Sequence, residues 1–399
     1  MATVAAQASE TSLLRCTRWA LYLTVAGLPL YVVRWHYGHL PTTLLETLIV
    51  ITVVLYVVAR WREGMRRPVS TSYDIPILLL LLAGAVSVMV AKDHRAALGL
   101  YRAYFVEPVA IFYVAADLLR TSGQLLRAVF AFAIGSSAFA AINLAVFVKA
   151  LLAHAVNVGA APNAFYGDAN YVAMYMEPPV AFAIAFVLFG HKGRLRLFGG
   201  AWLAITGSAL FVMFSKGSYA ALAVLVIVVL LTAPRWRLPL LGALVVAIVA
   251  ATQIPLVWQR LGTIPPSLNG RQEIFGAAAG MIRDHPLLGL GLGGFSYAFR
   301  GTTPEIYPHD MWLTFWLEVG LLGVVAFGVI LFSLLWRGWR AWPSMDGVYR
   351  PLLWGVLGGL VLWTVHGLVD SPYWKNDMSV EFWTLAALQL ATLRSARAT

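Results

Sequence analysis

Cationic and imidazole side chains in the second half of the chain are of the types that bind anions and transfer protons. Asn269 and Gln272 have the spacing of a helix cap, and the apolar residues that follow at helical spacing predict a helix that ends before Pro286. Arg271 would lie at the second position of that helix, where a cation opposes the helix dipole. A bound anion, such as a phosphate, would offset that cost. The alternative is an arginine paired with a lipid headgroup or with Glu273.

Two further cations lie within apolar stretches. Lys216 belongs to the Ser-Lys-Gly sequence 215–217, inside a stretch that is too long for one membrane crossing, so the chain must turn there. A lysine at such a turn either binds an anion or extends its charge to the membrane surface. Arg102 lies in another apolar stretch, where a charge usually faces a cavity or a partner. It either binds substrate or pairs with Glu107 or Glu46.

His309 follows Pro308 at the start of an apolar stretch, with Trp312 and Trp316 on the same helical face. Because a helix N-terminus disfavours imidazolium, we expect this histidine to be neutral at pH 7 and able to accept a proton. We expect it to face a cavity floored by the two tryptophans and covered by the helix that carries Arg271. The alternative is a histidine that hydrogen-bonds a lipid headgroup or a carbonyl group.

Three other patterns are less informative. A polar cluster close to the C-terminal end either supports a site or forms an ion-paired cap: His366, Asp370, Lys375, Asn376 and Asp377. The glycine-rich run 289–294 is only a weak match to a nucleotide-binding loop, because no strand precedes it. The carboxylates between the apolar stretches lack metal-ligand spacing, so we expect no metal and no cofactor.

The amino-acid composition predicts the kind of structural elements that hold these residues in position. The chain has 399 residues, of which 60% are hydrophobic and 12% charged, whereas an average soluble domain has about a quarter charged residues. This composition predicts an all-α, polytopic integral membrane protein that forms a single transmembrane domain over residues 1–399. Allowing about 20 residues per crossing, we expect twelve spans. They lie at roughly 18–33, 41–59, 74–91, 97–119, 128–152, 170–190, 197–214, 218–233, 238–256, 310–335, 351–368 and 379–393.

The net charge of +11 is distributed between the apolar stretches, so it indicates topology and not a nucleic-acid partner. Alternate connections are strongly basic, and by the positive-inside rule they are cytoplasmic. Both termini are then cytoplasmic, which requires an even number of spans. The basic residues are Arg15, Arg18, Arg60, Arg62, Arg66, Arg67, Arg120, Arg127, Lys192, Arg194, Arg196, Arg235, Arg237, Arg337, Arg340, Arg350, Arg394 and Arg397.

One connection is much longer than the others. It covers about residues 257–308, between the ninth and tenth spans, and the charge alternation places it outside. Loops of this length are usually functional. The helix predicted after Asn269 is amphipathic, so we expect it to lie on the outer membrane surface. A second external segment, about 154–169, leads into the sixth span with Asn163, Asp168 and Asn170.

Four motifs in this region carry a resemblance to a known family. They are Ser215-Lys216-Gly217, Asn269-Gly270-Arg271, Pro286-Leu287-Leu288-Gly289-Leu290-Gly291, and Pro308-His309-Asp310 leading to Leu317-Glu318-Val319-Gly320-Leu321-Leu322-Gly323. In order, spacing and position relative to the long external loop, they resemble the bacterial O-antigen ligases and polymerases, which act on lipid-linked polysaccharide. The similarity covers roughly residues 200–330.

The resemblance implies transfer of a glycan from an undecaprenyl diphosphate donor to an acceptor hydroxyl, such as a sugar of lipid A core. It further implies a site on the periplasmic or outer face of the cytoplasmic (inner) membrane. Arg271, Lys216 and Arg102 would then bind the diphosphate, and His309 would be the base. The family usually has arginine where this chain has Lys216, and asparagine where it has Asp310. We expect inversion at the anomeric carbon, without a metal.

The residues leave alternatives open. A polymerase of the same family would use a second lipid-linked repeat as the acceptor, and a protein glycosyltransferase would use a protein. A small-anion transporter is the alternative from another class. It would use Arg102, Glu107, Glu177 and Lys216 as a path through the membrane, and it would not need an elaborate loop on one side.

Overall fold

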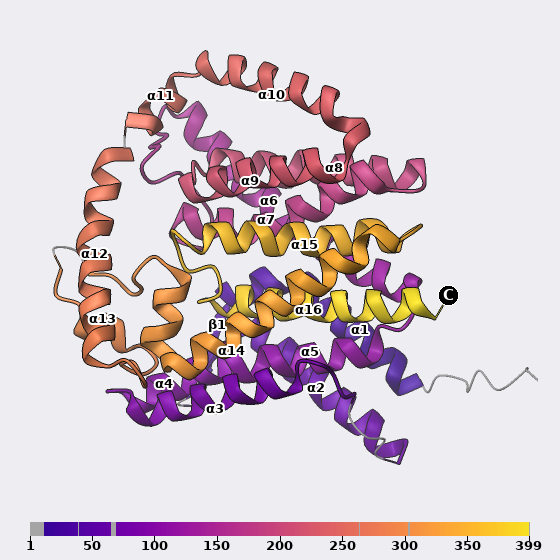
Figure 1. Cartoon of the computed structure of the whole chain (residues 1–399), viewed down its shortest axis with the longest axis vertical. Helices are drawn as coiled ribbons and strands as arrows, with labels where there is room; N and C mark the ends of the chain where they lie inside the picture. Colours follow the sequence, from indigo (N-terminus) through magenta and orange to yellow (C-terminus); the bar gives the residue numbers. More distant parts are fainter. Residues whose placement is uncertain (1–11, 39, 65–68, 263, 302–303, 399) are drawn as a thin grey trace, which may run out of the picture.

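A computed structural model describes residues 12–38, 40–64, 69–262, 264–301 and 304–398, and these residues are almost entirely helical (Figure 1). The helices are α1 (Ser12–Ala26), η1 (Leu28–Val32), α2 (Leu44–Arg62), α3 (Asp74–Val90), α4 (His94–Tyr101), the π-helical η2 (Arg102–Val106), α5 (Glu107–Leu118), α6 (Ser122–Leu152), α7 (Ala169–Phe189), α8 (Gly193–Val212), α9 (Lys216–Thr232), η3 (Pro234–Trp236), α10 (Arg237–Thr252), α11 (Pro255–Gly262), α12 (Ile264–Asp284), α13 (Gly294–Ala298), α14 (Met311–Ala341), η4 (Trp342–Ser344), α15 (Tyr349–His366) and α16 (Asn376–Arg397). Within the described residues the strands are β1 (Arg34–Tyr37) and β2 (Leu40–Thr43), which pair as one antiparallel hairpin.

The all-α prediction is confirmed, and a helix lies in each of the twelve predicted spans. By length and composition, the described residues include six helices able to cross a membrane: α2, the continuous α4–α5, α6, α7, α8 and α14. There are up to seven if α9 and the following helix, bent by 114° at their junction, count as one. The α3 helix has 17 residues, which is shorter than a usual crossing. Neighbouring helices bury α15 and α16 along most of their length.

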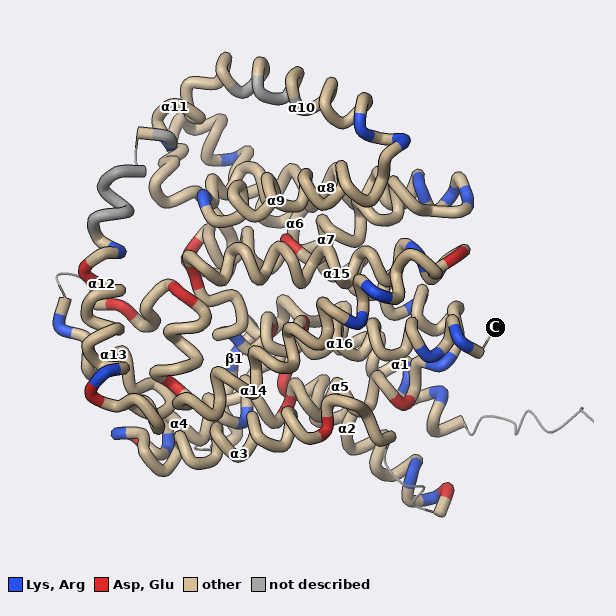
Figure 2. Tube along the Cα trace, viewed as in Figure 1, with Lys and Arg blue, Asp and Glu red and all other residues tan. Residues whose placement is uncertain are grey.

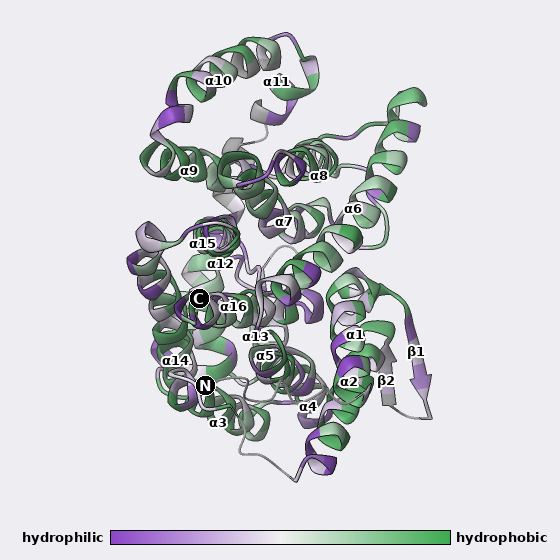
Figure 3. Ribbon diagram, turned by 90° about the vertical axis from the view of Figure 1, so that its right-hand side faces the viewer, coloured by the Kyte–Doolittle hydropathy of each residue, from purple (hydrophilic) through white to green (hydrophobic). Residues whose placement is uncertain are grey.

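Most of the long helices run side by side, whereas α12 lies across one end of the bundle (Figure 1). Lys and Arg residues are frequent at the opposite end, which holds the C-terminus, while the end near α12 and α13 carries both signs of charge (Figure 2). Viewed along the bundle, outer helices such as α10 and α6 are mainly hydrophobic (Figure 3). This arrangement fits a bundle surrounded by lipid, with α12 lying close to one polar boundary.

The start of α12 differs from the prediction. The helix begins at Ile264, so Asn269 lies inside it and Arg271 lies about two turns from its N-terminus. Two consecutive prolines, at 265 and 266, explain this start, since the first helical turn does not need their missing N–H groups. The predicted end is confirmed, because α12 stops at Asp284. The expectation that the α12 dipole opposes Arg271 at the second helical position is therefore wrong.

The apolar side of α12 packs onto α13 and α14. Ile274 and Ala278 are buried together with Phe295, Phe299 and Leu317. The amphipathic character predicted for this helix thus serves packing against protein, which fixes α12 over the end of the bundle.

A break in α14 explains two of the sequence motifs. Gly320 has φ 72° and ψ −176°, so the helical ladder is interrupted there. The loop after α12 replaces the missing bonds: Leu290 N–H donates to Leu317 O at 2.6 Å, and Leu321 N–H donates to Leu287 O at 2.9 Å. The glycine-rich run therefore packs against α14, and both backbones have hydrogen-bond partners inside the protein.

The buried Glu318 joins the same unit from inside α14. Its carboxylate accepts hydrogen bonds from the backbone N–H groups of Gly293 and Phe295, and the latter bond is 3.3 Å long. The Pro286–Gly291 and Leu317–Gly323 motifs thus form a single packing unit that holds α12 and α13 in place.

Gly320→Ala should destabilise the protein, because a Cβ atom at this position would lie 2.4 Å from Leu287 O and because its backbone conformation is available almost only to glycine. We expect a loss of about 1–3 kcal/mol, measured by thermal unfolding in detergent. Gly328→Ala in the same helix is the matched control, since its Cβ would make an ordinary contact of 3.6 Å with Trp312. Equal stability of the two variants would contradict the assigned role of the break.

Candidate active site

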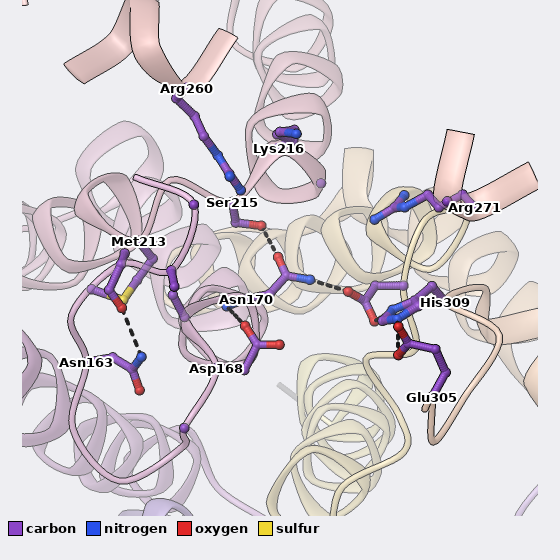
Figure 4. A pocket seen from close by; sticks show the side chains of 18 of the residues that line it. Asn163, Asp168, Asn170, Met213, Ser215, Lys216, Arg260, Arg271, Glu305 and His309 are labelled. Carbon is purple, nitrogen blue, oxygen red and sulfur yellow. Dashed lines mark hydrogen bonds and ion pairs between the residues drawn. The ribbon is translucent and has the colours of Figure 1, made fainter. Parts of the chain in front are cut away.

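A cavity of about 750 Å³ lies at the end of the bundle that α12 crosses. Its walls come from the segment before α7, the turn between α8 and α9, α11, α12, and the segment before α14 (Figure 4). The lining includes both cations and carboxylates: Lys216, Arg260, Arg271, Asp168, Glu273, Glu305, His309 and Asp370. The cavity thus brings together side chains that are separated by up to about half of the chain.

Three cations from three helices line one part of the cavity. Lys216 is the first residue of α9, Arg260 lies on α11, and Arg271 lies on α12. Arg260 was not predicted to line the site. It lies in the long connection that the sequence predicts to be external, so, like Lys216, it is a cation that departs from the predicted charge alternation. Its Nε donates to Phe214 O at 2.7 Å, which fixes α11 against the turn that carries Lys216.

The turn predicted at 215–217 is confirmed, because α8 ends at Val212 and α9 begins at Lys216. Ser215 caps α9 by accepting a hydrogen bond from Ser218 N–H at 3.3 Å. Ser215, Lys216 and Gly217 all line the cavity, so a helix N-terminus does face it, but that terminus belongs to α9 and not to α12. The partial positive charge of this terminus adds to that of the side chains.

His309 lies in the cavity wall between two carboxylates. Its Nε2 is 3.0 Å from Glu305 Oε2, and its Nδ1 is 3.4 Å from Asp370 Oδ1. Burial alone would lower the pKa of His309, but the hydrogen bonds and charges of Asp370 and Glu305 raise it to about 9. The expectation of a neutral histidine at pH 7 is therefore wrong. The two carboxylates stabilise the imidazolium more than a helix terminus disfavours it.

The N-cap of α14 is Asp310, whose side chain accepts a hydrogen bond from Leu313 N–H at 2.8 Å. Asp310 therefore starts the helix and is absent from the cavity lining, as are the two predicted floor residues. Trp312 packs against Phe327 with a ring separation of 6.0 Å, and Trp316 Nε1 donates to Pro286 O at 2.8 Å. The predicted tryptophan floor is therefore wrong.

A chain of hydrogen bonds connects His309 to the turn before α9. Asn170 donates to Asp370 through its side-chain amide and accepts from the Ser215 hydroxyl (Figure 4). The buried Asp370 also accepts from Ser371 N–H at 2.8 Å. Although burial favours the neutral carboxyl, the hydrogen bond and charge of His309, together with the charge of His366 and the Ser371 N–H bond, lower the pKa of Asp370. The histidine and the Lys216 turn are therefore held in one framework.

His366 lies directly behind the cavity wall. Its Nδ1 is 2.5 Å from Glu177 Oε1, which also accepts from the Ser218 hydroxyl at 2.8 Å, and His366 and Glu177 are both fully buried. A Cβ atom on Gly217 would lie 2.4 Å from His366 Nε2, so the imidazole ring packs closely on the backbone of the turn. His366 therefore supports the Lys216 turn and is not among the residues that line the cavity.

The structure does not bring Arg102 or Lys375 to the cavity lining. Arg102 pairs with Glu46 at 2.8 Å and with Glu107 at 3.2 Å, which agrees with the ion-pair alternative for this residue. Lys375 lies among tyrosines, with its Nζ 3.7 Å from the centre of the Tyr171 ring. The cavity lining therefore gives no support to the prediction that Arg102 binds the same anion as Arg271 and Lys216.

Comparison with known proteins agrees with the motifs. Residues 199–328 match the family model described as O-antigen ligase. The matched region runs from α8 into α14 and contains Lys216, Arg260, Arg271 and His309. No curated protein matches the chain. The match confirms the resemblance to the O-antigen ligase and polymerase family.

Glu177→Gln should destabilise the protein strongly, because it leaves the buried His366 without the carboxylate that pairs with it. We expect a loss of roughly 3 kcal/mol in the free energy of unfolding, measured by chemical denaturation in detergent. The control is Glu63→Gln, which removes the partly exposed pair with Arg60 and should cost less than about 1 kcal/mol. If Glu177→Gln is as stable as the control variant, this pair does not support the turn.

Proposed function

We propose that this protein is an O-antigen ligase-type membrane glycosyltransferase. It moves a glycan from an undecaprenyl diphosphate donor to an acceptor hydroxyl, such as one of a lipid A core sugar. The observation that carries the proposal is the convergence of Lys216, Arg260 and Arg271 on the cavity that also contains His309. The family match over this region supports the choice of reaction. Basic residues at the opposite end of the bundle support an outward-facing site with cytoplasmic termini.

The proposed reaction is a displacement at the anomeric carbon of the donor. The acceptor oxygen forms a bond to this carbon while the bond from carbon to the diphosphate oxygen breaks, and the diphosphate leaves with the electron pair. The three cations and the α9 N-terminus neutralise the charge that develops on the leaving group. Attack from the opposite side inverts the configuration. A diphosphate that is neutralised in this way can leave without being protonated. The cations therefore account for most of the rate enhancement, and no metal is needed.

The acceptor proton requires a base, and the charged His309–Glu305 pair can take it. Because the pKa of His309 is raised to about 9, its imidazole is already protonated at neutral pH and cannot itself accept this proton. We assign the accepted proton to the carboxylate of Glu305, while the imidazolium keeps its positive charge near the diphosphate. Asp370 positions the ring through Nδ1.

Arg271→Ala and Arg260→Ala should each weaken donor binding by roughly tenfold or more, because each removes a charge-assisted hydrogen bond to the diphosphate. Lys216→Ala should weaken it less, since a lysine binds phosphate as a point charge, and Lys216→Arg should be tolerated. Binding of the lipid-linked glycan to protein in nanodiscs measures the effect. Arg283→Ala, at the exposed end of the same α12 helix, is the control. Wild-type donor affinity in Arg271→Ala would remove the diphosphate assignment.

His309→Ala should lower turnover by roughly a hundredfold to ten-thousandfold while donor binding persists, because Glu305 loses the imidazolium that positions it as the base. In the wild type, kcat/KM reports the ionisation of the free enzyme, so it should fall as the pH rises through about 9, where the imidazolium loses its proton. The pH profile of glycan transfer measures this limb. His285→Ala, an exposed histidine at the end of α12, should keep the wild-type profile. A rate that rises through pH 9 would show that neutral imidazole is the base.

A further inference from the structure

A lysine surrounded by tyrosines lies beside the proposed active site. Lys375 Nζ is 3.7 Å from the ring centre of Tyr171, 5.5 Å from that of Tyr31 and 5.6 Å from that of Tyr166. It donates one hydrogen bond, to the Tyr31 hydroxyl at 3.1 Å. Arg34, at the start of β1, lies over the Tyr31 ring at 5.7 Å and adds a second, exposed cation. We call Lys375 and the tyrosines at positions 31, 166 and 171 the tyrosine–lysine cluster.

Two more tyrosines extend the cluster towards the cavity. The Trp374 ring contacts Tyr104 at 6.0 Å and Tyr307 at 5.9 Å between ring centres. Tyr307 lies two residues before His309, and Tyr171 directly follows Asn170, which lines the cavity. Tyr104, Tyr171, Tyr307 and Lys375 are all partly exposed. The aromatic surface therefore begins beside Asn170 and His309, which line the cavity.

The ammonium group of Lys375 has unused hydrogen-bonding capacity. An ammonium has three N–H donors, and among the described residues one acceptor and no carboxylate within 4.0 Å are found for Nζ. Asp377 is the carboxylate that acts most strongly on Lys375, but it lies beyond ion-pair distance. Its charge and the three rings offset only part of the cost of burying the cation. The positions that remain open at Nζ suit an anionic oxygen, and the surrounding rings suit the C–H face of a sugar.

We propose that the tyrosine–lysine cluster binds the acceptor glycan through a sugar that carries an anionic group, a phosphate or a carboxylate. Identifying this ligand with the acceptor rests on the proposed function. The diphosphate then lies in the cavity, against Lys216, Arg260 and Arg271, and the acceptor sugar lies next to the cavity, against the tyrosine–lysine cluster. His309 and Glu305 line the cavity, each two residues from Tyr307 in the sequence, and the attacking hydroxyl must lose its proton beside them.

Saturation-transfer NMR on the purified full-length protein, without any donor, tests the cluster directly. The probes are glucose, glucose 6-phosphate, glucuronate and inorganic phosphate. We expect both anionic sugars to bind at least roughly tenfold more tightly than glucose, as one charge-assisted hydrogen bond would give, and phosphate alone to bind weakly because it lacks a sugar face. Equal binding of glucose and the anionic sugars would overturn the proposal.

Variants show where the probes bind. Lys375→Met should abolish the preference for anionic sugars, Lys375→Arg should keep it, and Tyr171→Phe should bind better than Tyr171→Leu. Lys92→Met is the matched control, because Lys92 lies 5.6 Å from the ring centre of Tyr297 elsewhere on the molecule. An equal loss in Lys92→Met, or a loss that follows Arg271→Ala instead, would overturn the assignment to this cluster.

The sugar-binding proposal and the glycosyltransferase proposal can be disproved independently of each other, because the binding measurement needs neither donor nor turnover. If glycan transfer is established in the wild type, Lys375→Met should raise the acceptor KM and leave the donor KM unchanged. A raised donor KM with an unchanged acceptor KM would contradict the acceptor assignment while leaving the glycosyltransferase proposal intact.

Discussion

The hydrogen bonds that join Asp370, Asn170 and Ser215 connect three segments on which the candidate site depends. They tie the loop after α15 to the start of α7 and to the turn before α9. Through Asp370 they also reach His309, and through Ser215 they reach the N-terminus of α9. His309 and Lys216, for which we propose roles in proton transfer and in anion binding, thus belong to one hydrogen-bonded framework. Such preorganisation is what electrostatic catalysis requires.

The membrane imposes a second constraint on the same region. Backbone groups at a helix break need partners inside the protein, because lipid offers none. The break at Gly320 meets this requirement through Leu287 and Leu290, and these hydrogen bonds fix the loop after α12 to α14. Arg271 projects into the cavity from α12, which is held in this way. The motifs shared with the O-antigen ligase family are therefore of two kinds. Some line the cavity, and the others hold α12 in its place beside the cavity.

Much of the helical framework could be predicted because long apolar stretches determine where helices form. The number of membrane spans could not be predicted in the same way. Helices such as α15 and α16 are enclosed by other helices, so their apolar residues pack against protein as much as against lipid. The start of α12 was missed because the capping pattern at Asn269 outweighed the two prolines upstream. The charge of His309 depends on Asp370, which is 61 residues away in the sequence. Local sequence spacing does not predict a contact between His309 and Asp370. The contact with Glu305, four residues before His309, could have been predicted from the sequence.

The central claim is that three cations hold a diphosphate leaving group while a hydroxyl attacks the attached sugar. The most direct measurement is reconstitution of the purified protein with an undecaprenyl diphosphate-linked glycan and a lipid A core acceptor, in the presence of a chelator. Free undecaprenyl diphosphate and glycosylated acceptor are then counted together. The account predicts that the two products appear in equal amounts, with inverted linkage. Transfer without release of the diphosphate lipid, or transfer that needs added divalent metal, would contradict it.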